Sequence, residues 1–190
     1  YPSWLAVHPD LEHLYAVNEN EFQPEAGKPS FASAFSMDRA AGGLTLLNRA
    51  SAVGQGPCHA SVDATGRWLM LANYGSGSVA VLPIQAGGRL GEAAAFVQHR
   101  GSSVHPRQAG PRAHCVAPSP GNRFVLAADL GLDQLLVYRF DAARGALAPN
   151  DPPSAKIAAG SGPRHFAFHP NGRLLYLVNE LSNTVTVFGY

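Results

Sequence analysis

Arginine, histidine and glutamate side chains stand at the two ends of one short segment, GPRHFAFHPNGRLLYLVNE at residues 162–180. Arg164 and His165 open its first apolar run, Glu180 closes its second, and a Pro-Asn-Gly turn lies between them. Antiparallel pairing through that turn would bring the two ends together. Arginine binds carboxylate or phosphate, histidine exchanges protons near neutral pH, and glutamate acts as a general base or holds the arginine. The segment therefore predicts a site for a small anionic molecule.

Two other segments carry similar residues at the corresponding place. With one inserted residue allowed in PRAHC, His59 and His114 align with His165. Arg112 then precedes its histidine as Arg164 does. We expect His59, His165 and Arg112 to contact substrate. Hydrogen bonds to the backbone of a neighbouring repeat would also explain the aligned histidines, and salt bridges between repeats would explain the arginines.

One further histidine lies on a linking segment. His105, in SSVHPRQAGPR, lies on a long loop that leads into the predicted site. Loops above a rigid scaffold often contribute to binding. We therefore add His105 to the expected substrate-binding residues.

These segments belong to an internal repeat that defines the fold. Its four copies begin at Pro2, Pro57, Pro111 and Pro163, about 52–55 residues apart, a period that suits a four-stranded propeller blade. Each copy reads as an apolar strand, a turn, a second apolar strand and an alternating strand such as TVTVFGY. A weaker fourth strand follows in the first three copies. We predict an all-β chain, residues 1–190 forming one partial β-propeller with blades at about 1–54, 55–109, 110–160 and an incomplete 161–190.

Composition limits the partners and the cofactors. The 190 residues are 46% hydrophobic and only 14% charged, with a formal net charge of +1, so we expect neither nucleic acid nor a membrane as partner. No apolar run reaches the ~20 residues of a membrane span. We expect a cytoplasmic protein, or a periplasmic one if a leader has been removed. No histidine and carboxylate show metal-ligand spacing, and no phosphate-binding glycine loop precedes a helix, so we expect no metal and no cofactor.

Three of the repeats resemble a known family. GPCHASVDATGRWLMLANYGSGSVAVLPI, GPRAHCVAPSPGNRFVLAADLGLDQLLVYRFD and GPRHFAFHPNGRLLYLVNELSNTVTVF are similar to the lactonase family of seven-bladed β-propellers, which has 6-phosphogluconolactonase and muconate-lactonizing branches. The resemblance implies a seven-bladed ring of which this chain holds about half. It also implies His114, Arg164 and Glu180 as catalytic residues, while a second arginine of the family's site would lie beyond Tyr190.

The resemblance implies metal-free hydrolysis of a sugar-acid lactone, with 6-phosphogluconolactone as the leading substrate. Arg164, with Arg112, would bind the anionic group or stabilise the oxyanion, and His114 or Glu180 would be the general base. Two alternatives stay open: a muconate-type cycloisomerase, and a non-catalytic propeller that binds a ligand or a partner protein. The TVTVFGY edge would also allow self-association with another copy.

Overall fold

Four antiparallel sheets make up the part of the chain that the structure describes, residues 2–19 and 30–190 of a computed structural model. The first sheet has β1 (Pro2–Val7), β2 (His13–Asn18), β3 (Phe31–Asp38) and β4 (Gly43–Ser51). The second has β5 (Pro57–Val62), β6 (Trp68–Asn73), β7 (Ser78–Pro83) and β8 (Ala95–Gln98). The third has β9 (Ala113–Pro118), β10 (Phe124–Asp129), β11 (Gln134–Asp141) and β12 (Ala146–Lys156), and the last has β13 (Pro163–Phe168), β14 (Leu174–Asn179) and β15 (Thr184–Gly189).

This architecture confirms the prediction of an all-β partial propeller with three four-stranded sheets and one three-stranded sheet. Two 3-10 turns interrupt the linking segments, η1 (Ala86–Gly88) and η2 (Pro106–Gln108). Residues 20–29, within the predicted first blade, lie outside the described residues. Among the described residues no helix is long and apolar enough to cross a bilayer.

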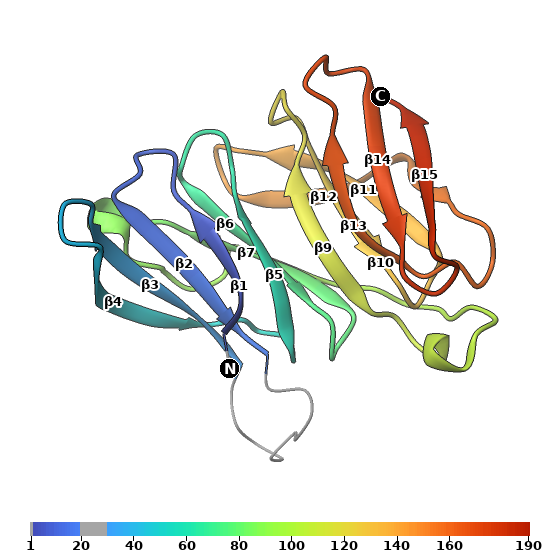
Figure 1. Cartoon of the computed structure of the whole chain (residues 1–190), viewed down its shortest axis with the longest axis horizontal. Coiled ribbons are helices and arrows are strands. Elements are labelled where there is room, and N and C mark those ends of the chain that lie inside the picture. The colour runs from blue at the N-terminus through green and yellow to red at the C-terminus, as the bar shows by residue number, and fades with distance from the viewer. Residues whose placement is uncertain (1, 20–29) are drawn as a thin grey trace.

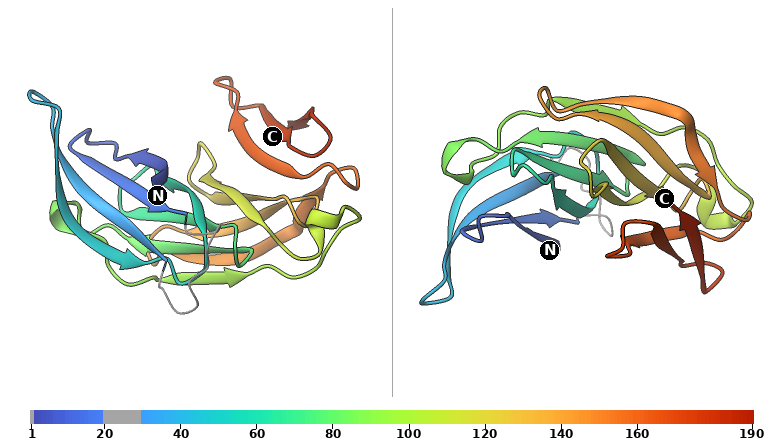
Figure 2. Two further views of the ribbon diagram at one scale, coloured as in Figure 1. Left: turned by 60° about the horizontal axis from the view of Figure 1, so that its bottom comes forward. Right: turned by 90° about the horizontal axis from the view of Figure 1, so that it is seen from above.

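The sheets follow one another around an open arc, with the first and last sheets at its two ends (Figures 1 and 2). The first strand of each sheet lies on the inner side, so that β5 packs beside β1 and β9, and β13 packs beside β9. Apolar clusters fill the spaces between successive sheets, as with Leu69 and Leu71 in the first space and Leu175 and Leu177 in the last. The inner strands therefore start side by side, at one mouth of the arc.

A bulge at the start of each inner strand sets which side chains enter that mouth. In the second sheet Pro57 pairs with Asn73 and His59 with Ala72, so that one residue is left over. All four inner strands show this shift, and the extra residues are Ser3, Cys58, His114 and Arg164. A β-bulge redirects the side chain of its extra residue.

The bulge corrects one alignment made from sequence. Ala113 pairs with Asp129 as Pro57 pairs with Asn73, so the third repeat needs no inserted residue. His114 therefore occupies the place of Arg164, and Cys115 the place of His59. Arg112 occupies the place of Gly56 and Gly162, because its backbone carbonyl makes the equivalent hydrogen bond. The Arg112 carbonyl accepts from the Leu130 amide, as the Gly56 carbonyl accepts from Tyr74 and the Gly162 carbonyl from Glu180.

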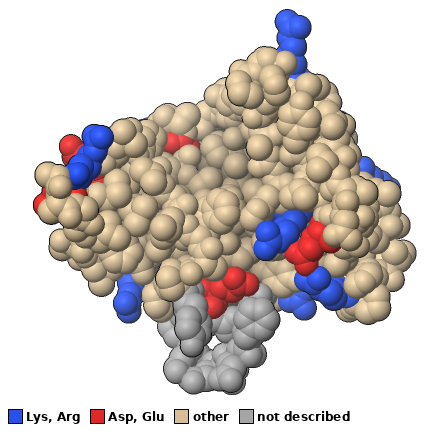
Figure 3. Space-filling view, viewed as in Figure 1, with Lys and Arg blue, Asp and Glu red and all other residues tan. Residues whose placement is uncertain are grey.

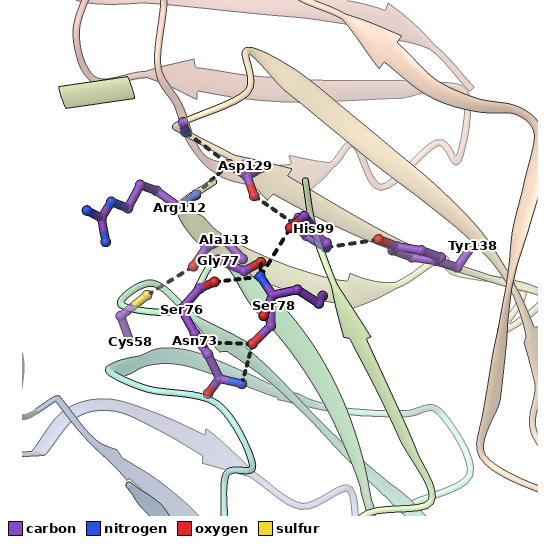
Figure 4. A network of polar contacts seen from close by, with 12 residues as sticks. Cys58, Asn73, Ser76, Gly77, Ser78, His99, Arg112, Ala113, Asp129 and Tyr138 are labelled. Atoms are coloured by element: carbon purple, nitrogen blue, oxygen red, sulfur yellow. Dashed lines mark hydrogen bonds and ion pairs between the residues drawn. The ribbon is translucent and has the colours of Figure 1, made fainter. Parts of the chain in front are cut away.

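A buried polar network fixes the second sheet against the third (Figure 4). The carboxylate of Asp129 accepts a hydrogen bond from His99 Nδ1 at 2.6 Å and from the Arg112 and Gly131 amides at 2.7 and 2.9 Å. The other ring nitrogen of His99 meets the Tyr138 hydroxyl at 2.9 Å. Every polar atom named here has a partner, as buried groups require. The network holds the Arg112 backbone, and with it the start of β9, at a fixed place in the mouth.

Candidate active site

Four aromatic rings from the four inner strands meet at the mouth. Trp4 lies 4.3 Å from His59 and 5.1 Å from His165 between ring centroids. His165 in turn lies 5.5 Å from His59 and 5.0 Å from His114. The structure thus brings together the three histidines expected at the site. His59 and His165 hold paired positions in their strands, whereas His114 is the extra residue of the bulge in β9. Side chains of the first and fourth sheets touch across the centre of the arc.

The three imidazoles are neutral at neutral pH. Burial lowers the pKa of His59 to about 3, with a further contribution from the charges that His165 and His114 would carry. Burial, Arg164 and His165 together lower the pKa of His114 to about 4. Burial and the Arg164 charge also lower the pKa of His165. A neutral imidazole can accept a proton, so the mouth contains candidate general bases.

We predict that acid destabilises the fold through His59 and His114. Both are buried and neutral in the folded protein, whereas the unfolded chain takes up protons below its pKa of 6.5. Stability is therefore present above about pH 6.5 and is lost as the pH falls toward the folded values. At about 1.4 kcal/mol for each pH unit and each histidine, the free energy of unfolding drops by about 4 kcal/mol between pH 7.5 and pH 5.

Urea unfolding at several pH values measures this loss. A His59→Gln variant removes one of the two histidines counted here and should lose about half of this drop of about 4 kcal/mol. An unfolding free energy that stays constant over this range would contradict the assignment of buried neutral histidines.

Glu180 joins two arginines beside the histidines. Its Oε2 lies 2.9 Å from Arg164 Nε, and its Oε1 lies 2.6 Å from Arg107 Nη1. Partial burial alone would raise the pKa of Glu180, but the Arg107 hydrogen bond and the two arginine charges outweigh it and hold that pKa below its usual range. Glu180 is therefore ionised, with both oxygens bound. Figure 3 shows basic and acidic side chains adjoining toward the lower right of a largely uncharged face.

Tyr74 joins two arginines in a similar way. Its hydroxyl accepts a hydrogen bond from Arg107 Nη2 at 3.3 Å, and the Arg112 guanidinium lies 5.4 Å from its ring centroid. Arg112 Nη1 also donates to the Gly75 carbonyl at 3.0 Å. The Tyr74 ring meets His114 edge-on at 5.4 Å. Tyr74 thus connects the arginines with the histidine cluster.

His105 occupies a different place from the one expected. Its Nδ1 accepts a hydrogen bond from the Arg107 amide at 3.1 Å, so the imidazole caps η2. Its own amide donates to the Gln108 side chain at 3.0 Å. These contacts lie within the linking loop, and the loop residue that reaches the mouth is Arg107. His105 therefore positions Arg107, and its contact with substrate stays a prediction.

Three members of the mouth were missed by the sequence analysis as site residues: Trp4, Tyr74 and Arg107. Tyr74 had a usable signal, since it directly follows β6 as Glu180 follows β14. Trp4 likewise occupies the register position of His59 and His165. Arg107 had no such signal, because it lies in a linking segment outside the repeat.

One group of metal-ligand type lies away from the mouth, in the turn between β1 and β2. The ligand atoms of His8, Asp10 and His13 all lie within 4.8 Å of one another, contrary to the expectation from their spacing in the sequence. By atom type the three residues could hold a metal ion. In the structure Asp10 bonds His13 Nδ1 at 2.8 Å, and His8 Nε2 bonds the Gly66 carbonyl at 2.8 Å. The first bond lies within the turn, and the second holds the turn against the second sheet.

Comparison with known proteins identifies the family. The model described as "Lactonase, 7-bladed beta-propeller" matches residues 1–190. The chain belongs to this lactonase family. A 6-phosphogluconolactonase of Bacillus subtilis is 35% identical over 189 residues, which is 100% of this chain and 51% of that protein. A 6-phosphogluconolactonase of Serratia proteamaculans is 33% identical over 97% of this chain and 49% of its own length.

Two solved structures superpose on the whole chain. A periplasmic gluconolactonase of Pseudomonas aeruginosa has a TM-score of 0.93 at 37% identity, and this chain covers 53% of it. A putative 6-phosphogluconolactonase of Bacteroides fragilis has a TM-score of 0.89 at 36% identity, again with 53% covered. The chain thus spans about half the length of the relatives it matches.

Proposed function

We propose that this lactonase-family chain hydrolyses a sugar-acid lactone, with 6-phosphogluconolactone as the leading substrate. The observation that carries the proposal is the meeting of His114, Arg164 and Glu180 at one mouth, where Arg164 and Glu180 both act on the charge of His114. Relatives named 6-phosphogluconolactonase support this substrate class.

Arg164 supplies the positive charge that hydrolysis needs at the lactone carbonyl. Attack of water on that carbon places negative charge on the carbonyl oxygen, and a fixed guanidinium stabilises it. Glu180 holds Arg164 through Nε, which aims the rest of the guanidinium. Arg164 is 44% exposed, so a substrate can reach it from solvent.

His114 is the proposed general base. Both oxygens of Glu180 are already engaged in ion pairs with arginines. The His114 imidazole is neutral and can therefore take a proton from the attacking water. The carbon–oxygen bond of the ring then breaks, and the proton passes from His114 to the leaving ring oxygen. The product is the open-chain hydroxy acid, and His114 returns to its neutral form.

A buried nitrogen in the mouth supports a polar ligand there. His165 Nε2 is buried and has no hydrogen-bond partner among residues 2–19 and 30–190. Such a group costs about 1–3 kcal/mol unless it finds a partner. A hydroxyl group of a sugar acid would satisfy it once the surrounding rings move apart, since the nitrogen has almost no exposed surface in this structure.

The proposal is tested by the rate of lactone ring opening above the spontaneous rate, in a protein that carries residues 1–190. We expect catalysis with 6-phosphogluconolactone or glucono-1,5-lactone, and open-chain acid as the product. No rate above the spontaneous one with either lactone would contradict the proposal and favour a propeller that only binds ligands or partners. Turnover confined to a muconate would instead assign the chain to a lactonizing cycloisomerase.

Two further proposals concern partners and location. The outer strand β15 exposes Val185 and Val187, so this edge is where self-association with another copy would take place. A cytoplasmic location fits a phosphorylated substrate, and a periplasmic one fits the gluconolactonase neighbour.

A further inference from the structure

We infer that Arg107, Arg112 and Tyr74 form a subsite for a phosphate monoester dianion, with Arg107 as the residue that sets specificity. The inference rests on the proposed function and narrows it to lactones that carry a phosphate. Nothing in the repeat pattern assigns Arg107 a role, since it comes from the segment between the second and third sheets.

The loop that carries Arg107 is built to hold it in place. Gln108, the next residue, is fully buried and donates to the Leu130 carbonyl at 2.7 Å. Its side-chain oxygen accepts from the His105 amide, and its carbonyl accepts from the Ser103 amide at 2.9 Å. The His105 imidazole holds the Arg107 amide itself. A buried anchor and a cap thus fix the backbone of an exposed arginine over the mouth.

The charges of this subsite match a dianion. Arg107 contacts the Tyr74 hydroxyl and Arg112 its ring face. With Arg164 these arginines carry a charge of +3, and the one carboxylate of Glu180, shared between Arg107 and Arg164, leaves a net charge of +2. Arginine presents several donors in a planar fork that suits phosphate. Tyr74 accepts from Arg107 through its oxygen, which leaves its O–H hydrogen to donate to a phosphate oxygen.

The position of Glu180 separates this subsite from the reacting end. Its Oε1 faces Arg107 and its Oε2 faces Arg164, so the two arginines lie on opposite sides of one carboxylate. A substrate with its carbonyl at Arg164 would extend its far end toward Arg107 and Arg112. Arg107 is 50% exposed and open to that end.

Calorimetric titration with 6-phosphogluconate and with gluconate, at equal ionic strength, tests the inference. These two product acids differ only in the phosphate, so the ratio of their affinities measures the subsite and cancels effects on the sugar-acid part. We expect the wild-type protein to prefer 6-phosphogluconate. Arg107→Ala should reduce that ratio about tenfold or more, because it removes charge-assisted hydrogen bonds. Arg107→Lys should retain part of the ratio.

The matched control is Arg100→Ala, which removes the same charge from an exposed position on the same linking segment and should leave the ratio unchanged. Three results would each overturn the subsite: equal affinities of the wild type for the two acids, no binding of either acid, or an Arg107→Ala variant with the wild-type affinity ratio. Lactone turnover is measured separately on the wild-type protein. Turnover without phosphate preference refutes the subsite alone, and phosphate preference without turnover refutes the proposed function alone.

Discussion

Replacing Arg164 with alanine is expected to lower kcat/KM for lactone hydrolysis by about 100- to 1,000-fold, the usual cost of losing one oxyanion donor. The loss should fall mainly on kcat, because Arg164 gains its strongest interaction as charge develops on the carbonyl oxygen. Initial rates at saturating and at limiting lactone separate kcat from KM. Arg164→Lys keeps the charge but not the planar fork, and should recover only part of the activity.

Arg173→Ala provides the matched control for Arg164. Arg173 is exposed on the same sheet, at the turn between β13 and β14, and so lies at the opposite end of these strands. We expect it to keep wild-type kinetics. Equal losses in the two variants would show that the Arg164 effect is a general effect on the fourth sheet and would contradict its role in catalysis.

Replacing His114 with glutamine is expected to lower kcat by about 100- to 10,000-fold, as loss of a general base does. Glutamine keeps a polar side chain of similar size but accepts no proton at neutral pH. The pH profile gives a second readout. Activity in the wild type should fall as the pH approaches the low pKa of His114, about 4. This fall at the acid side of the pH–rate profile, its acid limb, should disappear in the variant.

His169→Gln is the control for this substitution. His169 lies in the turn after β13, where its Nδ1 accepts a hydrogen bond from the Asn171 amide at 3.1 Å. We expect wild-type turnover. If Glu180→Gln abolishes activity and the acid limb while His114→Gln leaves both intact, then Glu180 is the base and the assignment to His114 is wrong.

The fold could be predicted because its signals are local and repeated. Each copy has strand-length apolar runs and a turn with proline, asparagine or glycine, so all four copies independently predict the same antiparallel strand–turn–strand unit. The His-Pro turns illustrate this, since His8 and His169 each accept a hydrogen bond from the amide two residues later. These short-range contacts need no knowledge of the rest of the chain.

The site could be predicted only in part. Arg164 and Glu180 were found because an antiparallel pair brings its ends together, and the structure confirms their contact at 2.9 Å. The alignment of His114 was wrong because matching letters favoured an insertion, whereas a bulge and the pairing of Ala113 with Asp129 set the true register. Arg107 could not be found from repeats, because the burial of Gln108 decides where its loop lies.

The central claim is that a sugar acid binds where His114, His165 and Arg164 meet, and NMR of the histidine rings during titration with 6-phosphogluconate tests it most directly. We predict saturable shifts of the His114 and His165 imidazole signals, while His8 and His169, in turns at the other end of the inner strands, stay unchanged. Saturable binding that shifts only His8 or His169, or that leaves His114 and His165 unchanged, would contradict the account.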